Sequence, residues 1–321
     1  MKAVMFVPRP DGAVPEVREI PAPIPAAGEV LVRVRAAGLN RGEMMVRAAL
    51  KAGAPQQTGI EFAGEVAALG PGAKLRKLGD RVMGHWKAGQ AEYVAVDERL
   101  LVPVPDRLSW VEAGAWLNVF CTAHDAIVTN GQLQAGESLL VNAASSGIGV
   151  AAIQIAKLRG ASPVIGTSRS AEKREKLKTL GLPVAMDTNA TPEEVKAATG
   201  GKGVDVLIDN LGGPALQKNL ESMNVLGRIV SVGRLAANSG PVDMDLLALK
   251  RVKVIGVTFR TRSLEERIAC VQRCAADLLG PLAEGRLQPV IQQVFPMADI
   301  AAAHEAMLRD AHIGKLVIEI P

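Results

Sequence analysis

The stretch "ESLLVNAASSGIGVAAIQIAK", residues 137–157, joins an apolar run of strand length to an apolar run of helix length. Val150, Ile153 and Ile155 give the second run the buried positions of a helix. A turn of small residues between the two lets backbone approach a phosphate, and the first helical turn offers free N–H groups and a positive dipole end. The pattern predicts a nucleotide-binding unit. The turn residues expected at the phosphates are Ser145, Ser146, Gly147 and Ile148.

The fingerprint of such turns is G-x-G-x-x-G, and this chain keeps only part of it. Ala144 and Ser146 stand at the first two glycine positions, and Gly149 keeps the third. The motif by itself is therefore a weak signal. A strand-to-helix turn that binds no ligand remains an alternative interpretation.

Strand and helix patterns continue to alternate after this unit. Apolar runs of strand length are "SPVIGTS" (residues 162–168), "GVDVLIDNLGG" (203–213) and "GRIVSVG" (227–233), with helical patterns between them. Buried strands that alternate with helices form a parallel sheet covered on both faces. The sequence therefore predicts an α/β fold with a doubly wound, Rossmann-type sheet over residues 119–261.

The first hundred residues have a different texture. Short extended runs are separated by Pro and Gly, and within Glu29–Val34 every second position is a valine. This predicts a β-rich, barrel-like domain over residues 1–118, followed by a helical connection that begins near residue 110. Residues 262–321 do not extend the strand–helix alternation, so we expect them to return to the first domain.

Composition excludes several classes of protein. The chain has 321 residues, 48% of them hydrophobic, which is enough for two domains with separate cores. No apolar run reaches the ~20 residues of a membrane span, and the N-terminus lacks a secretory pattern, so we expect a cytoplasmic protein. A net charge of +4 with only 3% aromatic residues argues against nucleic acid as a partner.

Three cysteines are too few for a disulfide framework or a four-cysteine zinc site. Cys270 and Cys274 lie four residues apart in a predicted helix, which Ser263 and Glu266 open as a capping box. We interpret them as ordinary helix residues rather than a redox pair. Cys121 is interpreted as a small buried hydrophobe, with reaction towards electrophiles as the alternative.

The end of the second predicted strand favours NADPH over NADH. A dinucleotide fold that binds NAD places an Asp or Glu about 20 residues beyond the turn, at the adenosine ribose. Here Thr167, Ser168 and Arg169 stand at that place without a carboxylate, and Lys173 follows on the next helical turn. Hydroxyl groups and a guanidinium suit a 2′-phosphate. The alternative is that Arg169 and Lys173 are solvated charges at a helix start.

At this level of detail the whole chain resembles a known family. The segments "AAGLNRGEMMVR", "GQAEYVAV", "GKGVDVLIDNLGG" and "HIGKLVIEI" are similar to zinc-independent medium-chain dehydrogenases/reductases of the quinone oxidoreductase branch. "LNR" and "HIGK" resemble its subgroup named after the quinone oxidoreductase that a tumour suppressor induces. The resemblance implies a GroES-like first domain, a Rossmann cofactor domain and NADPH as cofactor.

The positions that bind zinc in metal-dependent relatives lack metal ligands here. They resemble Asn40 or Arg41, Ile60 and Asn118, and Ile60 cannot bind a metal. We therefore expect no metal site and a reaction in which hydride transfer needs no Lewis acid. A quinone acceptor suits this, because the hydroquinone product is stabilised by aromaticity.

The resemblance also implies site residues. Asn40 and Thr122 are expected to be catalytic and, with Gly233 and Phe259, to lie around the nicotinamide; Asn210 and Lys315 are expected near the cofactor. Asn40 has an equally good structural interpretation, in which it fixes its own loop.

Two other functions remain open. An enoyl-thioester or other activated-alkene reductase shares the fold and the cofactor, but typically has a tyrosine proton donor in the loop after Asn40, where this chain has none. His85 is a candidate donor, although a surface histidine is the simpler interpretation. The protein could also be an NADPH-binding sensor or structural protein with little turnover.

The resemblance implies a homodimer as well. The valine-rich run near Val252–Phe259 stands where the family's sheet has its edge strand, and would pair with the same run in a second copy. The partners expected are thus a small-molecule substrate and a second copy of the chain.

Overall fold

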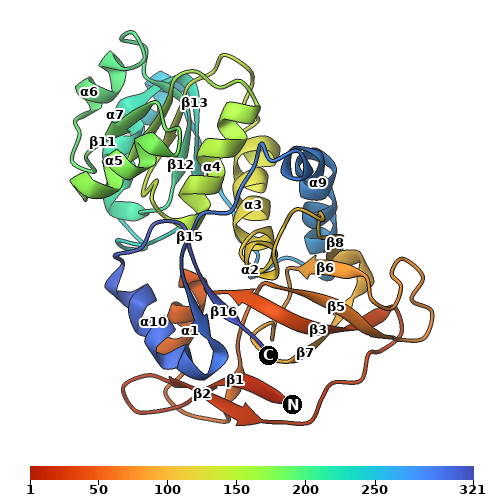
Figure 1. The fold of residues 1–321 in the computed structure, drawn as a ribbon. Helices are drawn as coiled ribbons and strands as arrows, with labels where there is room; N and C mark the ends of the chain where they lie inside the picture. The colour runs from red at the N-terminus through yellow and green to blue at the C-terminus, as the bar shows by residue number, and fades with distance from the viewer. The chain divides into compact units, whose positions relative to one another are not determined.

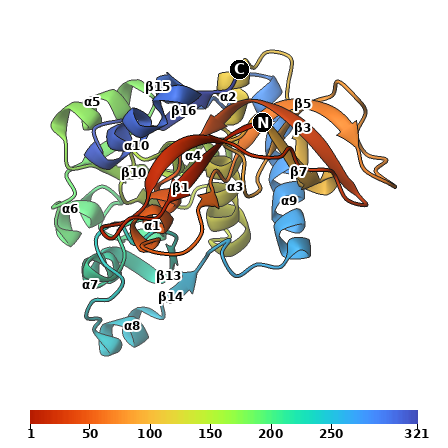
Figure 2. The same cartoon turned by 90° about the horizontal axis from the view of Figure 1, so that it is seen from below.

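The computed structural model describes residues 1–321, which form two compact units (Figures 1 and 2). One unit comprises Met1–Cys121 and Ser263–Pro321, and the other comprises Thr122–Arg262. We call them the discontinuous unit and the central unit. The chain passes from the first to the second within helix α3 (Leu117–His124).

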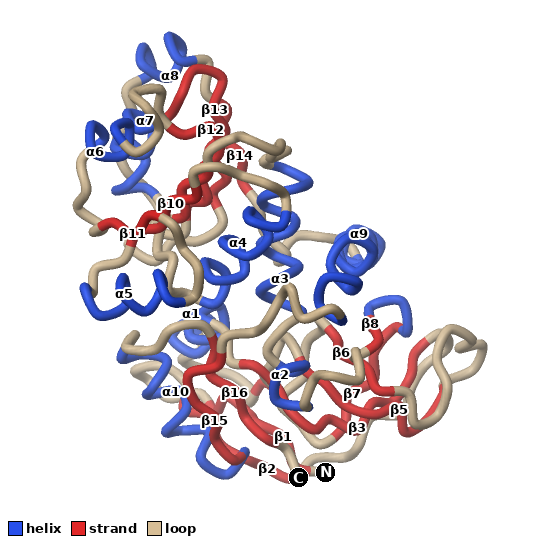
Figure 3. Tube along the Cα trace, turned by 45° about the horizontal axis from the view of Figure 1, so that its top comes forward, coloured by secondary structure: helices blue, strands red, loops and turns tan.

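The central unit contains one six-stranded sheet in the order β11-β10-β9-β12-β13-β14, with every neighbouring pair parallel. The strands are β9 (Leu139–Val141), β10 (Val164–Thr167), β11 (Val184–Met186), β12 (Val204–Asp209), β13 (Met223–Ser231) and β14 (Lys253–Gly256). The helices are α4 (Gly147–Leu158), α5 (Ala171–Thr179), α6 (Pro192–Ala197), α7 (Leu216–Ser222) and α8 (Met244–Lys250). Figure 3 shows these helices flanking the strands. The prediction of a doubly wound parallel sheet is confirmed.

The core of the central unit explains why its strands are continuously apolar. Leu140, Ile165, Leu207 and Ile229, from four adjacent strands, are all buried in one cluster. Strands covered by helices on both faces have no solvent side, so apolar residues fill consecutive positions.

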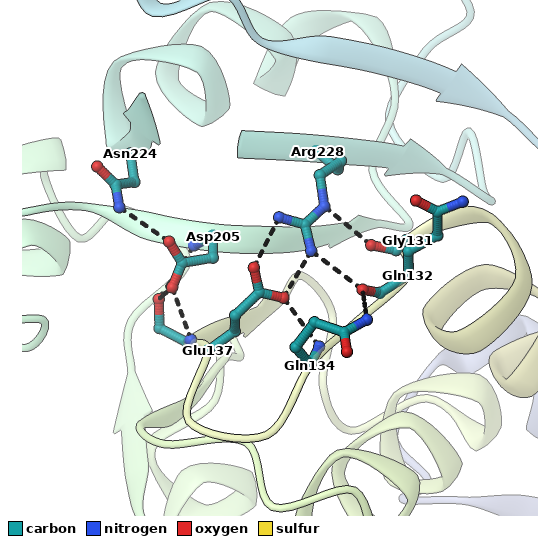
Figure 4. A network of polar contacts seen from close by, with 8 residues as sticks. Gly131, Gln132, Gln134, Glu137, Asp205, Asn224 and Arg228 are labelled. Atoms are coloured by element: carbon teal, nitrogen blue, oxygen red, sulfur yellow. Dashed lines mark hydrogen bonds and ion pairs between the residues drawn. The ribbon is translucent and has the colours of Figure 1, made fainter. Parts of the chain in front are cut away.

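A polar network holds the amino ends of three of these strands (Figure 4). Arg228 of β13 donates two hydrogen bonds to Glu137, at 2.9 and 2.6 Å, and one to the carbonyl oxygen of Gly131 at 2.9 Å. Asp205 of β12 accepts from the backbone and hydroxyl of Ser138 at 2.9 and 2.8 Å, and from Asn224 at 2.8 Å. The two-point geometry of a guanidinium on a carboxylate fixes orientation as well as distance. The network therefore fixes the loop that leads into β9.

The discontinuous unit is dominated by antiparallel strands. Its larger sheet has the order β15-β16-β3-β5-β6-β8, with β7 also paired to β3, and a smaller sheet has the order β2-β1-β4. The strands are β1 (Lys2–Val7), β2 (Val14–Glu19), β3 (Glu29–Gly38), β4 (Gln56–Gln57), β5 (Phe62–Leu69), β6 (Arg81–Gly84), β7 (Tyr93–Asp97), β8 (Leu101–Pro103), β15 (Ile291–Pro296) and β16 (Lys315–Glu319). The helices that lie wholly in this unit are α1 (Arg41–Ala49), α2 (Trp110–Gly114), α9 (Leu264–Ala283) and α10 (Ile300–Arg309). The last strand of the chain, β16, pairs with β3.

The helical connection expected from residue 110 is broken into shorter pieces. It consists of α2, α3 and a π-helical turn over Asp125–Asn130. Gly114 ends α2 where the backbone meets strand β3: a Cβ on Gly114 would lie 2.8 Å from the carbonyl oxygen of Ala36. A continuous apolar pattern does not reveal such a close approach.

Helix α9 follows its sequence pattern closely. Ser263 accepts from the backbone N–H of Glu266 at 3.3 Å, and Glu266 accepts from that of Ser263 at 2.7 Å, so the predicted capping box is confirmed. Cys270 and Cys274 are both buried on this helix, and none of the three cysteines forms a disulfide. No helix of the chain is both long enough and apolar enough to span a membrane.

His304 on α10 is a buried histidine whose ring nitrogens have no hydrogen-bond partner. Its ring packs edge-to-face on Phe6 of β1, with centroids 5.5 Å apart. Burial, assisted by the positive charge of Arg47, lowers the pKa of His304 to about 4. A protonated imidazole would have to leave water without gaining a partner, so the fold holds the neutral ring.

This burial predicts a loss of stability in acid. Between pH 6.5 and 4 the unfolded chain binds a proton at His304 that the folded chain does not, so stability falls as pH decreases. From about pH 7 to about pH 5 the wild type should lose about 2 kcal/mol more than His304→Leu, as measured by urea denaturation. Equal losses in both proteins would show that His304 is not held neutral.

Candidate functional site

The turn between β9 and α4 has the form that the sequence predicts. Ser146 caps α4, and its hydroxyl accepts from the backbone N–H of Gly149 at 3.1 Å. A Cβ on Gly149 would lie 2.5 Å from the carbonyl oxygen of Ala144, so only glycine allows this close approach. Ala143 supports the sharp turn with a φ of 52°.

This turn fits the phosphates of a dinucleotide. Ser145, Ser146, Gly147 and Ile148 lie together at the amino end of a twelve-residue helix. Gly147 and Ile148 are in its first turn, where backbone N–H groups have no acceptor within the helix. These groups and the helix dipole favour an anion at this position.

The segment after β10 lies next to this turn in the sheet, because β10 pairs with β9. Thr167 and Ser168 are buried, and Lys173 lies in the first turn of α5, which Ser170 caps. Arg174, which the sequence analysis did not single out, donates to the carbonyl oxygens of Ser168 and Arg169 at 2.8 and 3.0 Å. It thereby fixes the backbone that carries the predicted 2′-phosphate residues. Residues 167–170 contain no carboxylate.

Arg174 also forms an ion pair with Asp187 at 2.6 Å. The backbone N–H of Asn189, followed by the charge of Arg174, holds the pKa of Asp187 below its usual range. This carboxylate is thus the partner of a structural arginine at the strand end.

Asn142 joins three adjacent strand ends and was missed in the sequence. It is the first residue after β9, and its side chain donates to Asn219 at 2.9 Å and accepts from the Thr167 hydroxyl at 3.2 Å. Its carbonyl oxygen accepts from the side chain of Asn210, after β12, at 2.8 Å. The predicted residues Thr167 and Asn210 are therefore linked through a residue of the predicted turn unit.

Asp209, the last residue of β12, shapes the next loop. Its carboxylate accepts from the backbone N–H groups of Leu211 at 2.9 Å and Gly212 at 3.2 Å. Burial raises the pKa of Asp209, and these N–H groups oppose the shift. Gly233, after β13, donates its N–H to the carbonyl oxygen of Asp209. A Cβ on Gly233 would lie 2.6 Å from the carbonyl oxygen of Asn210.

Parallel topology brings most of the predicted cofactor residues to one edge of the sheet. Since the strands are parallel, the turn after β9 and the segments after β10, β12 and β13 all lie at the carboxyl edge. Phe259 follows the edge strand β14, where the guanidinium of Arg262 lies 4.7 Å from its ring centroid. Thr122 belongs to helix α3 and does not follow a strand of this sheet.

Asn40 and Lys315 meet in a buried cluster of the discontinuous unit. The Nζ of Lys315 donates to Glu61 Oε1 at 2.5 Å, to Asn40 Oδ1 at 2.7 Å and to the carbonyl oxygen of Leu39 at 2.6 Å. All three protons of the ammonium are used. Lys315 is 3% exposed and Glu61 1%, so this is a fully buried ion pair.

The side chain of Asn40 is fully hydrogen bonded within the protein. Its Nδ2 donates to Glu61 at 3.0 Å and to the carbonyl oxygen of Gly38 at 3.2 Å. Its Oδ1 accepts from Lys315 and from Asn118, both at 2.7 Å. An amide has two protons and two lone pairs, so these four bonds use its full capacity. The geometry favours the interpretation in which Asn40 fixes its own loop.

Two of the positions that bind zinc in metal-dependent relatives, Asn40 and Asn118, belong to the buried cluster around Lys315 and Glu61. Asn118 donates its backbone N–H to Glu61 at 3.0 Å in addition to its bond to Asn40. Ile60 directly precedes Glu61. The chain contains no group of three or more His, Cys, Asp or Glu side chains that could hold a metal ion.

The simpler interpretation of the sequence placed His85 on the surface. The structure shows that this was wrong. The ring of His85 is buried, and burial together with the charge of Arg267 lowers its pKa to about 4. Near neutral pH the ring is therefore neutral, so it is not an imidazolium that could act as a general acid.

Glu43, Glu61 and Gln90 are three further buried polar residues that the sequence analysis missed. Glu61 was visible as the acidic residue of "GIE", and Glu43 stands three residues after the helix cap Asn40. No local pattern marks Gln90, because the chain brings it to α1 only through long-range packing.

Comparison with known proteins identifies the family. Residues 26–106 match the alcohol dehydrogenase GroES-like domain, and residues 147–275 match the zinc-binding dehydrogenase domain. The human quinone oxidoreductase is 30% identical over 311 residues, which cover 94% of this chain and 92% of that protein. The human synaptic vesicle membrane protein VAT-1 homolog is 32% identical over 317 residues, covering 92% and 80% of the two chains. The chain belongs to the zinc-independent quinone oxidoreductase branch of the medium-chain dehydrogenases/reductases.

Solved structures agree with this membership. An NAD-dependent alcohol dehydrogenase has a TM-score of 0.88 at 31% identity over the full length of both chains. The CurK enoyl reductase has a TM-score of 0.87 at 27% identity, covering 100% of this chain and 99% of that one. The present medium-chain reductase is therefore an oxidoreductase with a nicotinamide cofactor, built from a GroES-like and a Rossmann domain.

The buried ion pair of this medium-chain reductase predicts an asymmetric response to mutation. Lys315→Met would leave the Glu61 carboxylate buried without its cation, and should lower the free energy of unfolding by about 3–5 kcal/mol. Adding Glu61→Gln should restore part of this loss, because the unpaired charge is then removed. Urea denaturation measures both, with Arg286→Met, in an exposed ion pair, as a near-neutral control. A double variant no more stable than Lys315→Met would contradict the charge argument.

Proposed function

We propose that the protein is an NADPH-dependent reductase that transfers hydride to a quinone-type acceptor. The observation that carries the cofactor preference is the strand end after β10, where Thr167 and Ser168 precede Arg169 and no carboxylate is present. In this proposal the turn Ser145–Ile148 holds the pyrophosphate. Thr167, Ser168, Arg169 and Lys173 bind the 2′-phosphate, while Asn210 and Gly233 shape the neighbouring strand ends.

Bound NADPH would supply the hydride, and the protein would orient cofactor and acceptor. The predicted nicotinamide residues Thr122 and Phe259 remain part of this proposal. We assign Asn40 and Lys315 a positioning role, because their polar atoms are already bonded within the protein. A quinone fits such a site, since the oxygens of the reduced acceptor can take protons from water. About 30% identity to the human quinone oxidoreductase supports the same acceptor class.

Reduction of an enoyl thioester or other activated alkene is the second candidate. Its support is the likeness to the CurK enoyl reductase and 30% identity to a phenolphthiocerol/phthiocerol polyketide synthase of Mycobacterium tuberculosis, of which this chain matches 14%. Against it stands the segment after Asn40, where α1 presents no tyrosine. The buried, neutral His85 does not replace such a donor.

Arg169 provides the test of cofactor choice. Arg169→Ala should weaken NADPH binding by about 1–3 kcal/mol, the loss of a charge-assisted hydrogen bond, and leave NADH binding nearly unchanged. Isothermal titration with both cofactors measures the difference. Lys178→Ala, in an exposed ion pair on α5, serves as the matched charge control. Equal weakening for NADPH and NADH would reject the assignment.

The acceptor class is tested by NADPH oxidation in the presence of EDTA, with an ortho-quinone and crotonyl-CoA as parallel acceptors. We expect faster turnover with the quinone. Turnover confined to the thioester would favour the second candidate. NADPH binding without turnover on either acceptor would instead favour a sensor or structural protein.

We further propose a homodimer formed through β14. This strand ends the sheet, so one row of its backbone groups has no neighbour within the unit. Val254 on β14 is exposed, as are Met244 and Leu249 on α8. An exposed apolar edge of this kind suits pairing with a second copy across a two-fold axis.

Light scattering at micromolar concentration should therefore give the mass of two chains. Val254→Lys should shift the protein towards monomer, because a charged side chain disfavours edge pairing. Leu75→Lys, at an exposed apolar position of the discontinuous unit, should remain dimeric. A monomeric wild type would reject the proposal.

A further inference from the structure

Glu43 and Gln90 form a buried pair with two unsatisfied oxygen atoms. Glu43, in the first turn of α1, is 3% exposed, and Gln90 is fully buried. Glu43 Oε2 accepts from Gln90 Nε2 at 2.9 Å and from the backbone N–H of Asn40 at 3.4 Å. Glu43 Oε1 and Gln90 Oε1 are both buried and have no hydrogen-bond partner.

One proton would satisfy both oxygen atoms. An ionised carboxylate can only accept, so it cannot bond to the amide oxygen of Gln90. A proton on Glu43 Oε1 turns this atom into a donor for Gln90 Oε1. The acid and the amide then form a closed pair of two hydrogen bonds, and the cost of two unpaired buried acceptors disappears.

The charges around the pair also favour the neutral acid. Lys315 is the nearby cation, but its three protons are directed to Leu39, Asn40 and Glu61. The Glu61 carboxylate already balances its charge, so an ionised Glu43 would add an uncompensated negative charge to the buried cluster.

The arginines of α1 are engaged elsewhere. Arg41 forms an ion pair with Asp310, the C-cap residue of α10, at 2.6 Å. Arg47 forms an ion pair with Glu305, within α10, at 3.3 Å. Burial raises the pKa of Glu43 to about 7; Lys315 opposes the shift and Glu61 adds to it.

We propose that Glu43 is a carboxylic acid in the folded protein, and that its proton-dependent pair with Gln90 positions Asn40 and the start of α1. Loss of the proton removes this hydrogen bond and leaves both buried oxygen atoms without a partner. The bond from Gln90 Nε2 remains, so the start of α1 loosens without unfolding. This inference rests on contacts within the discontinuous unit and does not depend on the proposed reaction.

Infrared spectroscopy detects the proton directly. The Glu43→Gln variant offers an amide N–H in place of the acid O–H and so mimics the protonated pair. The difference spectrum of wild type minus variant at about pH 6 should contain the carbonyl band of a protonated carboxylic acid, which disappears at about pH 9. A difference spectrum without this band at the lower pH would overturn the proposal. Should the variant fail to fold, the pH-difference spectrum of the wild type carries the same test.

Hydrogen exchange locates the consequence. At about pH 6, peptides covering residues 40–46 should exchange equally in wild type and Glu43→Gln. At about pH 8 the wild type should exchange several-fold faster than the variant at the same pH, since only the wild type loses its proton. Glu175→Gln, at an exposed carboxylate on α5, should follow the wild type. A ratio of exchange rates that does not change with pH would reject the positioning role.

Discussion

A fully buried ion pair between Lys315 and Glu61 is the constraint around which the discontinuous unit is organised. Two charges removed from water are stable only when each is surrounded by hydrogen-bond partners. The carbonyl oxygen of Leu39, the side chain of Asn40 and the backbone N–H of Asn118 meet that demand here. The partners come from the strand that ends the chain, from the loop before α1 and from the start of α3. The pair therefore joins segments that are more than 250 residues apart in sequence.

In the central unit the main constraint is different: buried polar groups at the carboxyl ends of the parallel strands need hydrogen-bond partners. Asn142 meets it by bonding to both neighbouring strand ends at once, through Thr167 and Asn210. Arg174 then fixes the backbone of Ser168 and Arg169. These internal bonds shape the edge at which the amino end of helix α4 lies, where backbone N–H groups without an acceptor in the helix favour an anion.

Three buried titratable groups of this protein favour their neutral forms where no ion pair is available. His85 and His304 have pKa values lowered to about 4, and Glu43 has one raised to about 7, in each case chiefly by burial. Lys315 and Glu61 differ from them, because they neutralise each other. Lys315 and Glu61 can remain charged in the interior because each is the counter-ion of the other, whereas an isolated ion would be costly to move out of water.

Local sequence patterns were enough to predict the fold class, the parallel order of elements and the strand-to-helix turn after β9, because these depend on periodicity and on glycine positions such as Gly149. The same patterns marked Thr167, Ser168 and Arg169 as candidate cofactor residues, because of their spacing from the turn. The folded chain was needed to show that Asn40 is saturated by its own protein, that His85 is buried and that Gln90 faces Glu43. Hydrogen-bond saturation and burial depend on residues distant in sequence, and no local pattern encodes which of them will meet.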